Sequence, residues 1–279
     1  MRHTNMLLSC ALALGLLGLA QAPAFGAPPD WEKVAKTKIF VFHPGVTPWE
    51  WVDAKGSHGG SRGLARGEAC IGCHMEGDDL NLDMARLASE LEPAGAPNTM
   101  IYPVSLQSAY DAENLYLRLS FKAPTGGFDK GDANNALKVT VLLSDPDVPK
   151  GKQVGCWASC HQDARTMPKA SSAEKTKYVQ SGSYQLMQWA SHNNTVSDGQ
   201  VDKERRMSGG QAKVKAEMTH QGDAYTLTFT RTNPGEGKTI PMGVAIHADH
   251  ASGRFHHVSL GYLLGIGADG DIKAYKSPE

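Results

Sequence analysis

Asn114-Leu-Tyr-Leu-Arg-Leu-Ser-Phe121 places an apolar residue at every second position, a period that predicts a β-strand with one buried face. The segment Tyr225–Arg231 follows the same alternation. Three further strands are predicted at 136–143, 241–247 and 256–264, with turn residues between them. Several short alternating strands of this kind predict an antiparallel β-sandwich, so the chain is expected to be mainly β.

The region before these strands has no such alternation. Residues 28–98 contain Pro-rich and Gly-rich stretches, which predict loops and short helices. One helix is expected over Leu80–Leu91, where apolar residues recur at helical spacing. We therefore expect a loop and short-helix segment at 27–98, ending in a linker near 92–97, and a sandwich domain at 99–279.

Residues 1–26 have the composition of a secretory signal peptide. Arg2 and His3 precede an apolar run of about 15 residues, which is shorter than the roughly 20 that a membrane-spanning helix needs. Small residues follow the run, and cleavage is expected after Ala24 or Gly26. No later segment is comparably apolar, so the mature chain is expected to be exported to the periplasm without a membrane span.

The charge and the cysteines narrow the class of protein. The chain has 28 Lys and Arg residues against 29 Asp and Glu, which argues against the basic surface of a nucleic-acid-binding protein. Of five cysteines, Cys10 lies inside the apolar run, too early for a lipidation site, and leaves with the signal peptide. The other four form two close pairs, each followed by His, and leave no cysteine for the disulfides common in exported proteins.

Cys70-Ile-Gly-Cys73-His74, the first motif, is the signature of covalent haem c attachment. Two thiols at this spacing reach the two vinyl groups on one edge of a porphyrin, and the next residue supplies the proximal imidazole to the iron. Half of a zinc site and a redox-active Cys-x-x-Cys are the alternatives. A zinc site needs a second pair of ligands at a suitable distance, and a redox motif does not need His74.

Cys156-Trp-Ala-Ser-Cys160-His161, the second motif, has one more residue between its cysteines. A three-residue gap still allows both thiols to bond to one haem, so a second haem c is predicted with His161 as its proximal ligand. A local disulfide is the alternative. It does not account for a histidine at the position that corresponds to His74.

Each iron needs a ligand on its distal side if the chain only carries electrons. His43 and His58 precede Cys70 in Gly-rich loops, which allow backbone to approach a porphyrin closely, so at least one is expected to bind the first iron. His247 and His257 flank a predicted hairpin turn of the sandwich, and one of them is expected to bind the second iron.

Other assignments stay open at the second iron. The segment 247–257, which also holds His250 and His256, is compatible with a copper or zinc site as well. Met167 and Met242 could bind the iron in place of a histidine, although methionine most often fills the core. Arg254 could pair with a haem propionate. His192 and His220 are expected to be solvated.

Three segments resemble the ethylbenzene-dehydrogenase-related haem-binding family: Pro103–Arg118, Gly155–Pro168 and Ile246–Ser259. The resemblance implies a β-sandwich that holds a haem at its end and passes electrons. Molybdoenzyme subunits of this family hold a b-type haem between Met and Lys. The cysteines of this chain indicate the c-type branch instead, so the Met/Lys pair is not carried over. The segments Phe42–Gly45, Trp49–Trp51 and His58–Gly60 are similar to those of dihaem members of that branch.

We therefore expect a periplasmic dihaem electron carrier rather than an enzyme. The resemblance implies redox proteins as partners, namely a membrane quinol-oxidising cytochrome and a terminal oxidoreductase. One alternative is a dihaem peroxidase or sulfur-compound oxidoreductase, which needs an iron with an open sixth position. The other is a haem-bearing electron-transfer subunit of a molybdoenzyme, which would copurify with its catalytic subunit.

Overall fold

The computed structural model describes residues 28–45, 58–89, 96–126, 130–160, 179, 181–253 and 255–278. Within these ranges the chain is mainly β, as the alternating segments predicted. Its strands are β1 Thr37–Phe42, β2 Met75–Glu76, β3 Asp79–Leu80, β4 Ile101–Tyr110, β5 Asn114–Lys122, β6 Leu137–Ser144, β7 Tyr184–Ala190, β8 Thr195–Val201, β9 Arg205–Arg206, β10 Lys215–Gln221, β11 Ala224–Thr232, β12 Lys238–Ala248, β13 His257–Ser259, β14 Tyr262–Ile266 and β15 Ile272–Lys276. Its helices are α2 Ser61–Ala65, α3 Cys70–His74, α4 Met84–Ser89, α5 Gly151–Cys160 and the 3-10 turn η1 His192–Asn194.

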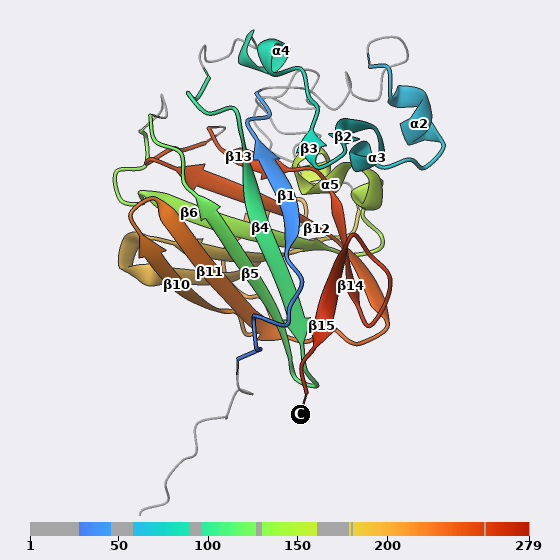
Figure 1. Ribbon diagram of the computed structural model, residues 1–279, viewed down its shortest axis with the longest axis vertical. Coiled ribbons are helices and arrows are strands. Elements are labelled where there is room, and N and C mark those ends of the chain that lie inside the picture. The colour runs from blue at the N-terminus through green and yellow to red at the C-terminus, as the bar shows by residue number, and fades with distance from the viewer. Residues whose placement is uncertain are drawn as a thin grey trace, which may run out of the picture.

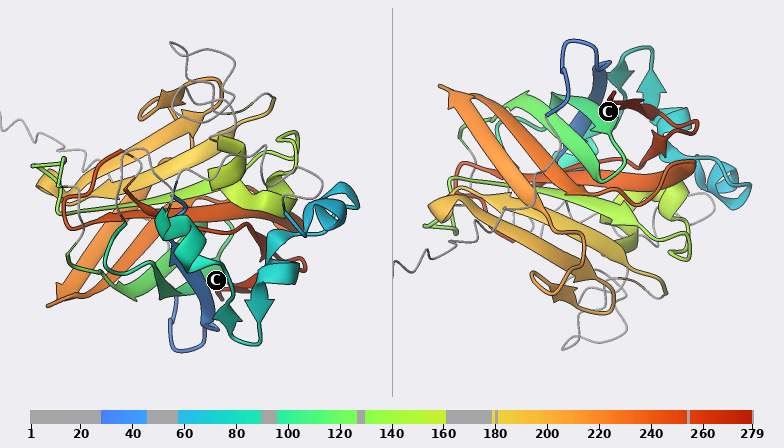
Figure 2. Two further views of the ribbon diagram at one scale, coloured as in Figure 1. Left: turned by 90° about the horizontal axis from the view of Figure 1, so that it is seen from above. Right: turned by 90° about the horizontal axis from the view of Figure 1, so that it is seen from below.

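The large sheet folds into two layers (Figures 1 and 2). One layer has the strand order β10-β11-β5-β4, and the other has the order β12-β6-β7-β8-β9. Two short connections join the layers along one side, because β1 pairs with β4 and β13, while β15 pairs with β4 and β14. The pairing is antiparallel except for that of β15. The predicted antiparallel sandwich is therefore the fold.

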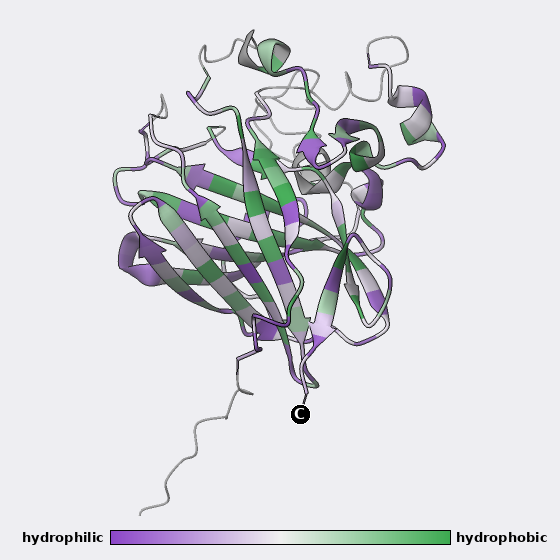
Figure 3. Ribbon diagram, viewed as in Figure 1, coloured by the Kyte–Doolittle hydropathy of each residue, from purple (hydrophilic) through white to green (hydrophobic). Residues whose placement is uncertain are grey.

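The core lies between the two layers and is built by the alternation that predicts the strands. Leu119 of β5 pairs with Leu106 of β4 on one side and with Leu227 of β11 on the other. All three side chains are completely buried. Full burial of a leucine side chain contributes about 2 kcal/mol, so each of these positions stabilises the sandwich appreciably. Figure 3 shows apolar segments along the strands, interrupted by polar ones.

Two expectations about the elements need correction. The helix predicted over Leu80–Leu91 begins only at Met84, because Leu80 pairs with Met75 in the β2–β3 hairpin; residues 90 and 91 lie outside the described residues. The single strand predicted at 256–264 is two strands, β13 and β14, separated at Leu260 and Gly261. The strand is interrupted there because Gly261 packs against the backbone of Gly155.

The alternation predicted part of the sheet and did not predict β4, β7, β8, β10, β15 or the two-residue strands β2, β3 and β9. β1 was missed as well. It lies in the N-terminal segment, yet it pairs with β4 and β13 inside the sandwich. Its last four residues, Ile39–Phe42, are all buried. A strand covered on both faces has no polar positions to alternate, so its pattern resembles any short apolar run.

The described helices are short, and none has the length and hydrophobicity needed to cross a membrane. The predicted signal peptide at 1–26 and most of the linker near 92–97 lie outside the described residues. The loops that carry α2, α3, α4 and α5 gather at one end of the sandwich (Figure 1). That end contains the first motif and the beginning of the second.

Candidate haem-attachment sites

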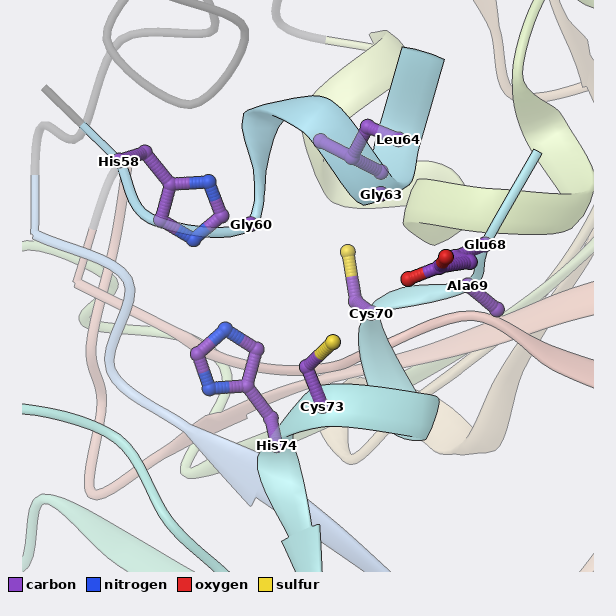
Figure 4. Close-up of a pocket in the computed structure, with 9 residues that line it drawn as sticks. All are labelled: His58, Gly60, Gly63, Leu64, Glu68, Ala69, Cys70, Cys73 and His74. Carbon is purple, nitrogen blue, oxygen red and sulfur yellow. The ribbon is translucent and has the colours of Figure 1, made fainter. Parts of the chain in front are cut away.

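The first motif forms the single-turn helix α3, Cys70–His74. Residues three or four apart lie on the same face of a helix, so this turn gathers both thiols and the imidazole on one side. The two cysteines are free thiols. Figure 4 shows Cys70, Cys73 and His74 facing one cleft, with His58 on the opposite side of it.

The rings of His58 and His74 are arranged as two axial ligands of one iron would be. Their centroids are 6.0 Å apart and their planes differ by only 13°. Two imidazoles bound at about 2 Å to opposite sides of one metal ion have ring centroids roughly 6 Å apart. In Figure 4 the nitrogen farther from the backbone points toward the other ring in both residues. The distance and orientation therefore fit an iron between the two rings.

A hydrogen bond sets the orientation of the His74 ring. Its Nδ1 lies 2.8 Å from the carbonyl oxygen of Asn81, at the end of the β2–β3 hairpin. Since a carbonyl only accepts, Nδ1 carries the proton and Nε2 keeps its lone pair. Histidines that bind metals commonly donate their second nitrogen in this way, which fixes the ring and makes the ligand more basic.

Gly60 makes room for the His58 ring. A methyl group on Gly60 would lie 2.8 Å from Cε1 of His58, whereas one on Gly59 would meet nothing within 4 Å. Position 60 therefore has a steric requirement that position 59 lacks. The other residues that line the cleft are Gly63, Leu64, Glu68, Ala69, Cys70 and Cys73.

The two thiols differ in their surroundings. Cys70 is buried and Cys73 is exposed. Burial disfavours the thiolate and raises the pKa of the Cys70 thiol to about 11. A buried thiol that stays protonated at neutral pH is poorly suited to binding zinc as a thiolate. No group of three or more His, Cys, Asp or Glu in the described part of the chain is arranged to hold a metal ion.

The second motif begins in helix α5, which packs on β12, β13 and β14. Gly155 has φ +72°, a left-handed conformation that favours glycine, and it bends α5 just before Cys156. A Cβ on Gly155 would lie 2.6 Å from the Cα of Gly261, so two glycine backbones touch here. The side chains of Cys156 and Cys160, and the whole of His161, lie outside the described residues.

His43 lies at the end of β1, apart from the pairing of His58 with His74. Its side chain is only 1% exposed and contacts the rings of Phe255 and His257. Its Nδ1 lies 3.4 Å from the carbonyl oxygen of His256, which makes Nδ1 the donor and leaves the lone pair on Nε2. The structure thus places His43 with the sandwich histidines and His58 with the first motif.

His247 and His257 direct Nε2 toward backbone carbonyls. The Nε2 of His257 lies 2.7 Å from the carbonyl of Thr99, and that of His247 lies 3.2 Å from the carbonyl of Gly253. The two residues point to different surroundings, because His247 stacks on His256 whereas His257 contacts Tyr102. Burial lowers the pKa of His247 to about 4 and also lowers the pKa of His257. Both imidazoles are therefore neutral at pH 7.

The remaining candidates have simpler surroundings. Met242 is 1% exposed and belongs to the sandwich core. His192 and His220 are exposed, as expected for solvated histidines. His250 donates from Nδ1 to the carbonyl of Asp132 in a neighbouring loop. Met167 and Arg254 lie outside the described residues.

Three residues that shape these sites were missed by sequence reasoning. Asn81 acts through its backbone carbonyl, and any residue type supplies one. Gly60 was noted only as part of a Gly-rich loop. Gln153 lies three residues before Cys156 and donates to backbone carbonyls near the first motif. Only the three-dimensional contact reveals the role of such a residue.

Comparison with known proteins identifies relatives along most of the chain. A family model described as ethylbenzene dehydrogenase matches residues 29–210. Cytochrome c-552 from Stutzerimonas stutzeri is 45% identical over 268 residues, covering 90% of this chain and 91% of the relative. Cytochrome c-551 from Rhodocyclus tenuis is 42% identical over 253 residues, covering 89% and 99%. A family 9 carbohydrate-binding module from Caldicellulosiruptor kristjanssonii is 11% identical, with coverages of 57% and 65% and a TM-score of 0.30.

Proposed function

Because the chain belongs to the ethylbenzene dehydrogenase family and is a c-type cytochrome within it, we propose that it is a periplasmic electron carrier with two covalent haem c groups. In this proposal residues 1–26 are a signal peptide. The segment 27–98 carries the first haem, and its strand β1 is part of the sandwich sheet. The sandwich at 99–279 carries the second haem. Bound haem supplies one-electron redox chemistry, while the chain sets the iron ligands, the burial and the access.

The pairing of His58 with His74 is the observation that carries the proposal. Cys70 and Cys73 attach the porphyrin, His74 is the proximal ligand and His58 the distal one. An iron with protein ligands on both sides has no open position for peroxide or another substrate, so this pairing favours a carrier over a peroxidase. Leu64, which is buried beside the cleft, excludes water from one side of it.

For the second haem we take Cys156 and Cys160 as the attachment residues and His161 as the proximal ligand. His43 is the best candidate for its distal ligand. It has the hydrogen-bonding pattern of His74, with Nδ1 donating to a carbonyl and the lone pair on Nε2. Nε2 lies farther from the backbone, which lets it reach an iron over the porphyrin plane.

His247 and His257 fit this role less well. Their Nε2 atoms donate to the carbonyls of Gly253 and Thr99, so the proton occupies the nitrogen that would have to bind the iron. Recruiting either one would break the hydrogen bond that its buried imidazole donates to a backbone carbonyl. In this proposal His43, rather than His247 or His257 as expected from the sequence, binds the second iron.

Intact mass and spectroscopy test the proposal together. The mature protein should exceed its polypeptide mass by two haem units, and both irons should be low-spin and unreactive toward CO when reduced. His58→Ala and His43→Ala should each make one of the two haems high-spin and able to bind CO. His220→Ala, at an exposed histidine, is the matched control and should change neither haem. Stoichiometric CO binding and peroxide turnover by the wild-type protein would show that the enzyme assignment is correct instead.

Localisation and partners need separate tests. Because haem c is attached outside the bacterial cytoplasm, a chain without residues 1–26 should accumulate without covalent haem. Covalent haem on that chain would contradict the periplasmic assignment. The family implies redox proteins as partners, a membrane quinol-oxidising cytochrome and a terminal oxidoreductase. The match to an ethylbenzene dehydrogenase model also favours a subunit of a molybdoenzyme as the second candidate, and copurification with a catalytic subunit would establish it.

A further inference from the structure

Gln153 joins the segments that contain the two motifs. Its side-chain amide nitrogen lies 2.7 Å from the carbonyl oxygen of Leu64 and 3.3 Å from that of Glu68. An amide NH₂ group has two hydrogens, so one side chain can donate to both carbonyls at once. Gln153 lies 85 or more positions from its acceptors in the sequence, and it is therefore a long-range connection.

Both ends of this connection lie next to haem-attachment residues. Leu64 and Glu68 line the cleft between His58 and His74 and lie six and two residues before Cys70. At the other end, Gln153 lies on α5 three residues before Cys156. Figures 1 and 2 show α2 and α3 at the same end of the molecule as α5.

Apolar packing supports the same contact. The side chains of Leu64, Cys70 and Val154 belong to one buried cluster, together with Leu260 of the β13–β14 connection. Val154 is 1% exposed, so α5 contacts the segment of the first motif through a buried side chain. The close contact of Gly155 with Gly261 in turn fixes α5 on the sandwich. The apolar cluster holds α5 against residues 64–70, and the two directed hydrogen bonds of Gln153 fix how these two segments are aligned.

We propose that Gln153 is a positioning residue that sets the separation and relative orientation of the two haems. This inference rests on the proposed function, because it requires a haem at each motif. When both haems are bound, a fixed separation would set the rate at which one electron passes between them.

Gln153→Met is the informative variant. Methionine has nearly the same length and remains compatible with the apolar cluster, but it has no N–H groups to donate. The matched control is Lys152→Met, which introduces the same residue at the adjacent exposed position of α5. Both variants are made in the full-length exported protein, so that haem attachment takes place normally.

The two variants are compared by three measurements. Intact mass should show two haems in both of them and in the wild-type protein. Amide hydrogen exchange at residues 64–70 should accelerate about tenfold in Gln153→Met, as expected for the loss of two hydrogen bonds, and should not change in Lys152→Met. After pulse reduction, the rate of electron exchange between the two haems should fall severalfold in Gln153→Met alone.

The outcomes separate this inference from the proposed function. One haem in the wild-type protein would refute the proposed haem count before any variant is compared. Two haems with unchanged electron exchange in Gln153→Met would overturn the positioning role, whether or not the amides exchange faster. Faster amide exchange together with slower electron exchange, in a protein that keeps both haems, would support it.

Discussion

Replacing Gly60 with alanine tests whether His58 binds the first iron without altering any ligand. Gly60 has φ −78° and ψ −6°, which an alanine adopts without strain. The new methyl group, however, would lie 2.8 Å from Cε1 and 3.4 Å from Nε2 of His58. Carbon atoms in contact prefer about 3.5–4.0 Å, so the imidazole must move by about 1 Å. A shift of this size is large compared with the tolerance of an iron–nitrogen bond of about 2 Å.

The expected result is a weakened sixth ligand at the first iron only. Reduced Gly60→Ala should bind CO at one of its two haems and show a partial high-spin signal, measured by visible and EPR spectroscopy. Gly59→Ala is the control, because its methyl group meets nothing within 4 Å. It should leave both spectra unchanged and stabilise the fold slightly, by about 0.4–1 kcal/mol, since alanine restricts the unfolded chain. Identical spectra for the two variants would refute the assignment of His58.

Three further results are expected. Gly155→Ala, which forces a side chain onto Gly261 at φ +72°, should lower the unfolding temperature and reduce the intact mass by one haem unit; retention of two haems at wild-type stability would contradict it. His74→Ala removes the proximal nitrogen and the bond to Asn81, so intact mass should show loss of the first haem, whereas full occupancy would argue against its proximal role. Burial raises the pKa of Asp132, but hydrogen bonds from Lys138 and Asn135 outweigh it and lower the pKa to about 2, below the unfolded value of 3.8. Asp132 therefore stabilises the fold above about pH 4, and this contribution is lost as the pH falls toward 2. Thermal unfolding should show Asp132→Asn to be less stable by about 1 kcal/mol at pH 7, with a smaller difference at pH 3, and an equal difference at both would exclude this linkage.

The sequence pattern predicts a strand most clearly where several large apolar residues share one buried face. In β5, Leu115, Leu117 and Leu119 are fully buried, and the alternation that predicts this strand follows from that burial. The pattern fails in β1, where consecutive residues are buried on both faces. It fails again at Gly261, where a contact with Gly155 ends one strand and begins the next. Burial on both faces of β1 and the contact of Gly261 with Gly155 both depend on residues far away in the sequence. A short window of sequence therefore cannot predict either one.

The candidate site divides in the same way. Cys70, Cys73 and His74 are recognisable because haem attachment requires them to be neighbours in the sequence, although their assignment stays a prediction. His43 and His58 both precede the motif, and sequence order alone assigned them to one iron. The structure separates them, because β1 carries His43 to the sandwich while the His58 ring lies parallel to that of His74. Such a division depends on strand pairing between distant parts of the chain.

The position of β1 has a consequence for the order of folding. Phe42 pairs with Val258, so β1 cannot complete its pairing until almost the whole chain has been synthesised. Contacts of such long range form late, because closing a large loop has a high entropic cost. Cys70 follows β1 and packs in a cluster that also requires Val258 and Leu260. The first motif should therefore remain accessible in the unfolded chain until the C-terminal strands have been synthesised, which is when its proposed haem would have to be attached.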